Sequence, residues 1–173
     1  MASRRKPPPS ATPLAAYRIA DSRFPLFDGR GAMLEGGRWN SPGYPVIYAS
    51  LSQSCAMLEI LAQTNIGKVP KHHKLIKIEI PANLNVETVS LTALPGWNHR
   101  NQGVSRAFGD TWLTSKRSVA LIVPSVIALH DRNLIINPLH PEFSQITSSA
   151  PEDIQWDERL FKNPKKGVSG FSG

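Results

Sequence analysis

The sequence predicts a single α+β domain without a membrane span. Its 173 residues are enough for one domain that buries its own core. The expected strands outnumber the expected helices and do not alternate with them regularly, which favours α+β over a doubly wound sheet. The composition, with 40% hydrophobic and 19% charged residues, is ordinary for a soluble globular protein. No run of about 18 apolar residues occurs, so no membrane contact is expected.

Two strands are expected in the first 50 residues. Residues 17–20 predict a first short strand, and residues 45–49 are β-branched and aromatic, which predicts a second. Residues 21–37 lie between them and contain too many glycine, aspartate and proline residues for a helix. This connection is therefore expected to be irregular.

A helix is expected directly after the second strand. Ser50 or Ser52 offers an N-cap, and the helix runs to about Gln63. Apolar residues recur there at helical spacing and form a stripe of Leu51, Cys55, Leu58 and Ala62. Glu59 lies at the edge of this stripe, where a carboxylate can border a pocket.

The clearest strand pattern covers residues 73–80. Ile76, Ile78 and Ile80 fall on one face, and Lys77 and Glu79 fall on the other. This alternation is typical of a half-buried strand.

The remaining elements are expected in the carboxyl-terminal half. Residues 86–91, 118–123 and 133–136 predict strands. Residues 105–116 predict a helix whose inward side chains are Val104, Phe108 and Trp112.

The two ends of the chain are expected to be disordered and basic. The net charge is +7, and residues 1–14 and 162–173 hold six of the twenty basic residues: Arg4, Arg5, Lys6, Lys162, Lys165 and Lys166. The domain between them, residues 15–161, is only mildly basic, which suits an anionic substrate or an acidic partner. Direct nucleic-acid binding is not expected, because the sequence has neither zinc-finger spacing nor an aromatic RNA-binding signature.

Three side chains form the most informative constellation. Arg38, Tyr48 and Glu59 follow one another at intervals of ten and eleven residues. A guanidinium pairs with phosphate oxygens, an aromatic face stacks on a ring, and a carboxylate steadies a developing cation. Together they suit chemistry on a nucleotide sugar.

Each residue also has a structural interpretation when it is taken alone. Arg38 fits a surface arginine stacked on Trp39, and Tyr48 fits a core aromatic with a hydrated hydroxyl. Glu59 fits a solvated helix residue, and Arg18 fits the outward position of a first strand.

Other site classes are not supported. Cys55 is the only cysteine, which excludes an internal disulfide and fits a reducing cytoplasm. His72 and His73 are adjacent and point apart on a strand, and no zinc-binding motif accompanies them, so no metal is expected. Ser125 has no nucleophile elbow around it, so a serine hydrolase is not expected. The glycines of residues 29–37 do not follow a strand into a helix, so they do not form a dinucleotide-binding fingerprint of the Rossmann kind.

Several blocks of this sequence resemble, in order, those of the RES-domain toxins. They are Tyr-Arg at 17–18, Gly-Arg-Trp-Asn at 37–40, the strand at 45–50, Leu-Glu at 58–59, and the segments 109–113, 123–125 and 133–141. The resemblance runs from Tyr17 to about Phe161. Arg38, Glu59 and Ser125 are the counterparts of the Arg, Glu and Ser that give the family its name.

The resemblance implies a fold, a substrate and a partner. The fold is similar to the ADP-ribosyltransferase toxins, with a strongly bent or split β-sheet and flanking helices. NAD is the substrate, no separate cofactor is implied, and members either degrade NAD by hydrolysis or phosphorolysis or transfer its ADP-ribose. The partner is an Xre-type helix-turn-helix antitoxin, through which any contact with DNA is made, and the basic surface suits an acidic segment of that partner.

The resemblance also implies roles for individual residues. Glu59 is expected to stabilise the cation formed at the ribose, Tyr48 to stack on nicotinamide, and Arg38 to hold the pyrophosphate or ribose. Arg18 is expected to assist Arg38, and Ser125 to donate a hydrogen bond to the dinucleotide. Further NAD contacts are expected from Tyr17, Trp39 and Asn137.

The acceptor stays open among alternatives. Many protein-modifying ADP-ribosyltransferases place Glu or Gln two residues before the catalytic glutamate, whereas Met57 stands there in this chain. A thioether cannot exchange a proton, which favours NAD degradation over modification of a protein. A ribonuclease toxin and an inactive binding module are the remaining hypotheses.

Overall fold

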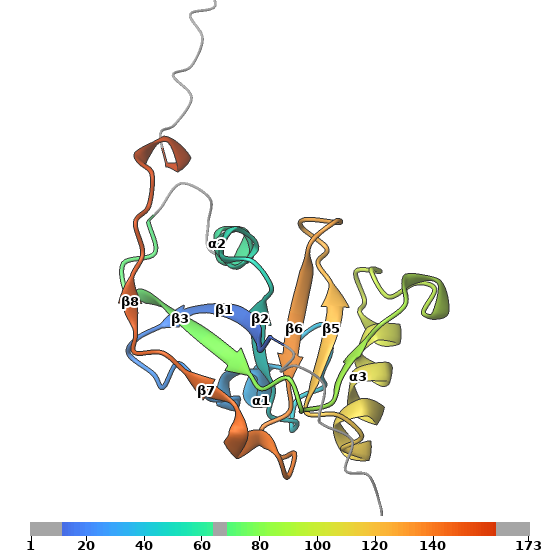
Figure 1. Ribbon diagram of the computed structural model, residues 1–173. Coiled ribbons are helices and arrows are strands. Elements are labelled where there is room, and N and C mark those ends of the chain that lie inside the picture. Colours follow the sequence, from blue (N-terminus) through green and yellow to red (C-terminus); the bar gives the residue numbers. More distant parts are fainter. Residues whose placement is uncertain (1–11, 64–68, 162–173) are drawn as a thin grey trace, which may run out of the picture.

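The computed structural model describes residues 12–63 and 69–161 of the chain (Figure 1). The tail expected at residues 162–173 and most of the lead expected at residues 1–14 lie outside these ranges. Leu14, which was expected in the lead, is the first residue of a strand. Within the described ranges no helix has both the length and the apolar character that crossing a membrane requires.

The described chain forms a mixed sheet with helices around it. The strands are β1 (Leu14–Asp21), β2 (Ile47–Ser50), β3 (His73–Ile80), β4 (Val86–Thr88), β5 (Ala120–Pro124), β6 (Arg132–Ile136), β7 (Thr147–Ser148) and β8 (Glu152–Asp153). The α-helices are α1 (Arg30–Glu35), α2 (Gln53–Gln63) and α3 (Gly103–Ser115). Short 3-10 turns lie at Leu91–Ala93, Phe143–Gln145 and Glu158–Leu160. The α+β class is confirmed.

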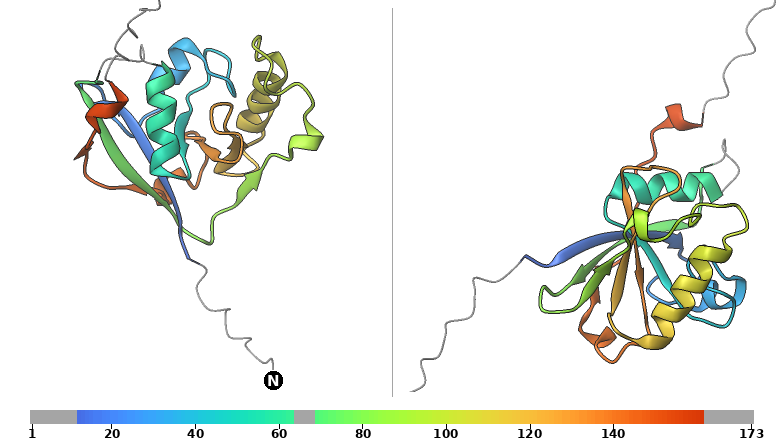
Figure 2. Two further views of the ribbon diagram at one scale, coloured as in Figure 1. Left: turned by 90° about the horizontal axis from the view of Figure 1, so that it is seen from above. Right: turned by 90° about the vertical axis from the view of Figure 1, so that its right-hand side faces the viewer.

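The sheet is split into two halves. Its strand order is β4-β5-β6-β2-β1-β3-β7, β8 also pairs with β3, and only β4 and β5 run parallel. β1 pairs with β3 along its whole length, and β2 pairs with β6 along its whole length. β1 and β2, however, meet only at Tyr17 and Ser50. The two halves diverge from this pair, as Figure 2 shows, and the expected split sheet is confirmed.

β3 has the predicted length and the predicted alternation. Ile76, Ile78 and Ile80 are buried, whereas Lys77 and Glu79 are exposed. The isoleucines pack with Ala16 and with residues of β2 and β6 in the largest core cluster. This cluster therefore joins the two halves of the sheet.

α2 begins where the sequence predicts, but its buried face differs from the prediction. Ser52 is the N-cap, because its Oγ accepts a hydrogen bond from the backbone N–H of Cys55 (3.1 Å). The predicted stripe is wrong at Leu58, which is 43% exposed, and at Ala62, which is also exposed. The buried residues are Cys55, Ala56 and Ile60.

The reason for this difference is the position of α2 in the fold. The helix lies over the point where β1 and β2 separate and packs on Ile19 and Leu75 (Figure 1). Only a narrow face is covered there, and Glu59 lies directly beside it. With Ala56 and Ile60 facing the sheet, the Glu59 side chain lies toward the gap between the two halves.

α1 interrupts the connection that was expected to be irregular. It has six residues and no side-chain N-cap. None of its residues is buried, so its sequence shows no apolar period from which a helix could be predicted. A tertiary contact supports it instead: Asn40 Nδ2 donates to the carbonyl oxygen of Ala32 (2.8 Å). Gly36 ends the helix with a φ of 73°, a conformation that favours glycine.

α3 lies beside β5 (Figure 1), and its buried face packs on residues of β5 and β6. Trp112 is fully buried as predicted, but Val104 is 41% exposed and does not point inward. Gly109 lies against the backbone of Trp39, so close that a Cβ would overlap the carbonyl oxygen of Trp39. α3 therefore holds the turn at residues 37–40 in place.

Replacement of Gly109 tests this contact. We expect Gly109→Ala to lower the free energy of unfolding by about 3 kcal/mol, at the upper end for overpacking, because the added methyl group meets rigid backbone. Urea unfolding measures the change. The matched control is Gly31→Ala in α1, where an added Cβ meets no atom within 4 Å. Equal stability of both variants would contradict the contact.

Candidate active site

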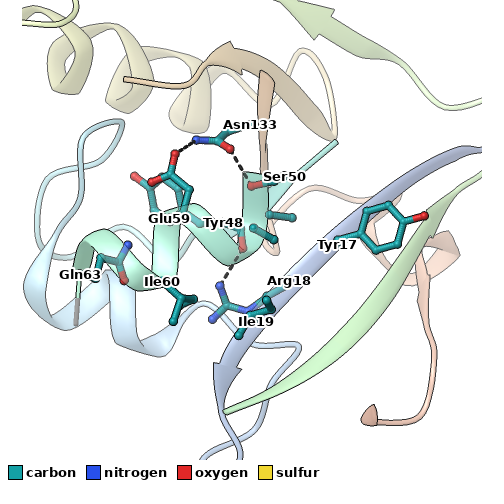
Figure 3. Close-up of a pocket in the computed structure, with 11 residues that line it drawn as sticks. Tyr17, Arg18, Ile19, Tyr48, Ser50, Glu59, Ile60, Gln63 and Asn133 are labelled. Atoms are coloured by element: carbon teal, nitrogen blue, oxygen red, sulfur yellow. Dashed lines mark hydrogen bonds between the residues drawn. The ribbon is translucent and has the colours of Figure 1, made fainter. Parts of the chain in front are cut away.

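A cleft opens where the two halves of the sheet separate. Its volume is about 920 Å³, and its walls come from β1, α1, the turn at residues 36–39, β2, α2, the start of α3 and the end of β5. A smaller recess of about 120 Å³ adjoins it and shares Arg18, Tyr48, Glu59, Gln63 and Asn133 with it (Figure 3). The cleft is large enough for a nucleotide-sized ligand.

Glu59 is held in this cleft by two hydrogen-bond donors. Asn133 Nδ2 donates to Glu59 Oε1 (2.6 Å), and Ser125 Oγ donates to the same oxygen (3.0 Å). Among the described residues no donor reaches Oε2. One oxygen therefore fixes the carboxylate, and the other is left to act on a ligand in the cleft.

The two donors are themselves held. Ser50 Oγ donates to Asn133 Oδ1 (2.7 Å), so Ser50, Asn133 and Glu59 form one chain of hydrogen bonds (Figure 3). Ser125 is fully buried, and its Oγ accepts from the backbone N–H groups of Ile127 and Ala128 (3.1 Å each). Because each member is bonded, the carboxylate is preorganised before any ligand arrives.

Arg38 is fixed on the opposite wall by backbone oxygens. Its Nη1 donates to the carbonyls of Trp97 (3.2 Å) and His99 (3.1 Å). Desolvation lowers the pKa of Arg38, and the nearby Glu59 carboxylate acts in the opposite direction. The guanidinium keeps its charge because the pKa of arginine lies far above neutral pH.

Tyr48 uses its hydroxyl to shape the Arg38 turn. Its Oη donates to Asn40 Oδ1 (2.7 Å) and accepts from the backbone N–H of Trp39 (3.0 Å). Gly37 permits this approach, because a Cβ there would lie 2.5 Å from the hydroxyl oxygen. Burial raises the pKa of Tyr48, so the phenol stays neutral at physiological pH.

Arg18 spans the split between β1 and β2. Its Nη1 donates to the carbonyl of Tyr48 and its Nε to the carbonyl of Leu26, each at 2.7 Å. The bond to Tyr48 satisfies a β2 carbonyl at the place where the strands no longer pair, and the bond to Leu26 satisfies a carbonyl in the connection after β1. Desolvation lowers the pKa of Arg18, and Asp28 partly offsets this effect.

The structure thus brings Arg18, Arg38, Tyr48, Glu59 and Ser125 together around one cleft. The role of Ser125 in the site differs from the prediction. Its hydroxyl hydrogen, expected to reach the dinucleotide, is donated to Glu59 instead.

Three predicted NAD contacts are not brought to the centre of the cleft. Trp39 is only 2% exposed and stacks on Trp97 at 6.2 Å between ring centroids, so its side chain belongs to the core. Tyr17 borders the smaller recess, but its ring points away from Glu59 (Figure 3). Asn137 follows β6 at the end opposite Asn133, about 13 Å along the strand. It is buried and donates to the carbonyl of Leu113 (3.0 Å).

Three residues of the site were missed. Asn133 holds Glu59, Ser50 holds Asn133, and Arg106 of α3 lines the cleft. Asn133 gave a weak signal, as a polar residue at the start of an apolar strand. In the described part of the chain no three His, Cys, Asp or Glu side chains gather in a metal-binding arrangement.

Comparison with known proteins gives this site a context. A family profile described as the RES domain matches residues 15–157. A Prs ADP-ribosylating toxin from Sphingobium sp. (strain YBL2) is 37% identical over 156 residues, which cover 88% of this chain and 94% of the relative. Toxin Res from Photorhabdus laumondii is 31% identical over 154 residues, which cover 86% of this chain and 98% of the relative.

A solved structure agrees with the fold. It is the MbcT–MbcA toxin–antitoxin complex of M. tuberculosis, with a TM-score of 0.68 and 19% identity over 84% of this chain and 86% of that chain. Fold and relatives together define the protein as a toxin of the toxin–antitoxin class. Within that class, the chain belongs to the RES-domain family.

The buried phenol predicts how stability depends on pH. In the unfolded chain Tyr48 loses its proton near pH 10, whereas in the folded chain its pKa is raised. The unfolded state therefore loses the proton first, and the stabilisation that is present below pH 10 is lost as the pH rises further. We expect the loss of unfolding free energy above pH 10 to be smaller in Tyr48→Phe than in the parent. Urea titrations from pH 8 to 11 measure this slope, with Tyr44→Phe as control; parallel slopes for parent and Tyr48→Phe would contradict the burial.

Proposed function

We propose that this toxin cleaves NAD at the bond between nicotinamide and ribose and so depletes cellular NAD. The observation that carries the proposal is Glu59, whose Oε1 is held by Ser125 and Asn133 in a cleft that also contains Arg18 and Arg38. A fixed carboxylate opposite fixed guanidinium groups suits a substrate with a diphosphate at one end and a developing cation at the other.

The chemistry follows from the charges of the reaction. As the bond to ribose C1′ breaks, its electron pair leaves with nicotinamide, and the ribose becomes an oxocarbenium-like cation, as in glycoside cleavage. Oε2 of Glu59 accepts a hydrogen bond from a ribose hydroxyl and stabilises that cation. Removal of one such preorganised group costs roughly 100- to 1000-fold in rate.

Tyr48 and the arginines place the substrate for this step. The ring of Tyr48 forms part of the cleft wall and stacks on nicotinamide, while its hydroxyl keeps the Arg38 turn in position. Arg38 binds the diphosphate. Arg18 lies behind Tyr48 and stabilises the floor of the site through the Tyr48 carbonyl.

Transfer of ADP-ribose to a protein is the second candidate function. It is favoured by the relative that is 37% identical and is named an ADP-ribosylating toxin. Met57, two residues before Glu59, favours water or phosphate as the acceptor, because a thioether cannot orient an acceptor through a proton. Both functions break the same bond, and they differ only in what attacks C1′.

The partner belongs to the same proposal. A toxin that consumes NAD requires an antitoxin in the same cell, and the solved structure that shares the fold is a toxin–antitoxin complex. We expect the cognate partner to be an Xre-type helix-turn-helix protein. Contact with DNA would then be made by the partner and not by this chain.

Expression of the toxin without an antitoxin tests the proposed function. We expect intracellular NAD to fall within minutes of induction in cells that express the parent, and to remain unchanged with Glu59→Gln. Immunoblots of both chains control for expression. Growth arrest with constant NAD would contradict degradation, and ADP-ribose found on a protein would then support the second candidate.

The hydrogen bonds to Glu59 predict graded effects. We expect Asn133→Ala to reduce NAD turnover about 10- to 100-fold, because an orienting hydrogen bond to a charged group is lost. Ser125→Ala should have a similar effect. Nicotinamide release by the purified variants measures both, and Ser149→Ala on the far edge of the sheet serves as control. Parent rates in Asn133→Ala and Ser125→Ala would show that neither bond positions Glu59.

A further inference from the structure

A third arginine lines the cleft beside Arg38. Arg106 lies on the first turns of α3, and its Nε donates to the carbonyl of Gly37 (2.8 Å), immediately before Arg38. Within the described chain no acceptor takes a hydrogen bond from Nη1 or Nη2 of Arg106. The side chain is therefore anchored at one nitrogen, and its two terminal nitrogens are available to a ligand.

The two guanidinium groups lie close enough to repel each other. The charge of Arg106 contributes to the lowered pKa of Arg38. Among the described residues no carboxylate forms an ion pair with either of them. Asp110, one helical turn after Arg106, is instead bonded to the backbone N–H and hydroxyl of Ser41 (2.8 and 2.6 Å).

Four other arginines of the described chain are arranged differently. Four arginines on the surface each pair with an acidic side chain: Arg23, Arg30, Arg117 and Arg159. Two like charges that lack a carboxylate partner repel each other and raise the free energy of the empty protein. A bound dianion removes this cost and gains charge-assisted hydrogen bonds.

We propose that Arg106 and Arg38 together form a clamp for the diphosphate of the substrate, and that Arg106 is the residue that selects a diphosphate over a monophosphate. The inference rests on the proposed function, because it names the recognition of the same substrate. Glu59, Arg38 and Arg106 all line the same cleft, and the charges of Glu59 and Arg106 both act on Arg38. In this proposal the ribose that reacts lies beside Glu59, and the diphosphate lies beside Arg38 and Arg106.

A purely structural role of Arg106 makes a different prediction. Its bond to Gly37 fixes the turn that carries Arg38 and Trp39. If that bond were its only contribution, its loss would weaken the binding of every phosphate ligand by the same factor. A clamp instead predicts a loss that is specific to the second phosphate.

Calorimetric binding of ADP and AMP distinguishes these roles without any turnover. We expect the parent to bind ADP more tightly than AMP. Arg106→Gln should weaken ADP binding about 10- to 100-fold, as for hydrogen bonds to a charged group, and change AMP binding less than about threefold. Arg106→Lys should recover only part of the ADP affinity, because an ammonium cannot donate as a fork. Arg117→Gln, two residues after the end of α3, is the matched control and should bind both nucleotides as the parent does.

The outcomes separate this inference from the proposed function. Equal losses of ADP and AMP affinity in Arg106→Gln, unchanged ADP affinity, or a parent that prefers AMP would each overturn the clamp. The thermal midpoint of each variant identifies a general loss of folding, and Arg106→Lys then supplies the comparison. NAD consumption by the parent is measured separately: if the parent consumes NAD but lacks the ADP preference, only the clamp fails.

Discussion

The contact between β1 and β2 is the constraint on which the rest of this structure depends. The two strands share one residue pair, Tyr17 and Ser50, and then separate. Separation leaves backbone carbonyls without strand partners, and buried carbonyls need hydrogen bonds. Arg18 supplies one at Tyr48 of β2, and it also binds the carbonyl of Leu26 in the connection after β1. The split thus requires a buried arginine. It produces a cleft between two halves that one hydrophobic core still joins.

The polar site follows from this opening. Glu59 reaches the cleft from α2, Ser125 from the end of β5, Asn133 from β6 and Ser50 from β2. Four elements that are distant in sequence therefore contribute to one hydrogen-bonded network. A network in which every member is bonded positions a charge well, because no member can rotate without leaving a buried polar group unpaired. Residues 37–40 complete the site from the other wall, held by Tyr48 and by the close packing of Gly109 on Trp39.

Much of the fold and the outline of the site could be predicted from the sequence. The alternation at residues 73–80 gave β3 with its full length, and the ordered blocks gave the family, the split sheet and the grouping of Arg38, Tyr48 and Glu59. Other features depend on tertiary contacts that leave no local pattern. α1 depends on a hydrogen bond from Asn40, and the buried face of α2 is set by its position over the split. Asn133 and Arg106 were missed because one looks like a strand residue and the other like a solvated helix residue. Asn137 was misplaced because a short motif does not show which end of a strand faces the cleft.

In the proposed reaction Glu59, held by Ser125 and Asn133, stabilises the cation that forms as the bond between nicotinamide and ribose breaks. The most direct test is the release of free nicotinamide from NAD by the purified chain, followed by chromatography with and without phosphate. We expect release by the parent and a loss of roughly 100-fold or more in Glu59→Gln, with its fold unchanged by circular dichroism. Equal release by the two chains, or none by the parent under any of these conditions, would contradict it.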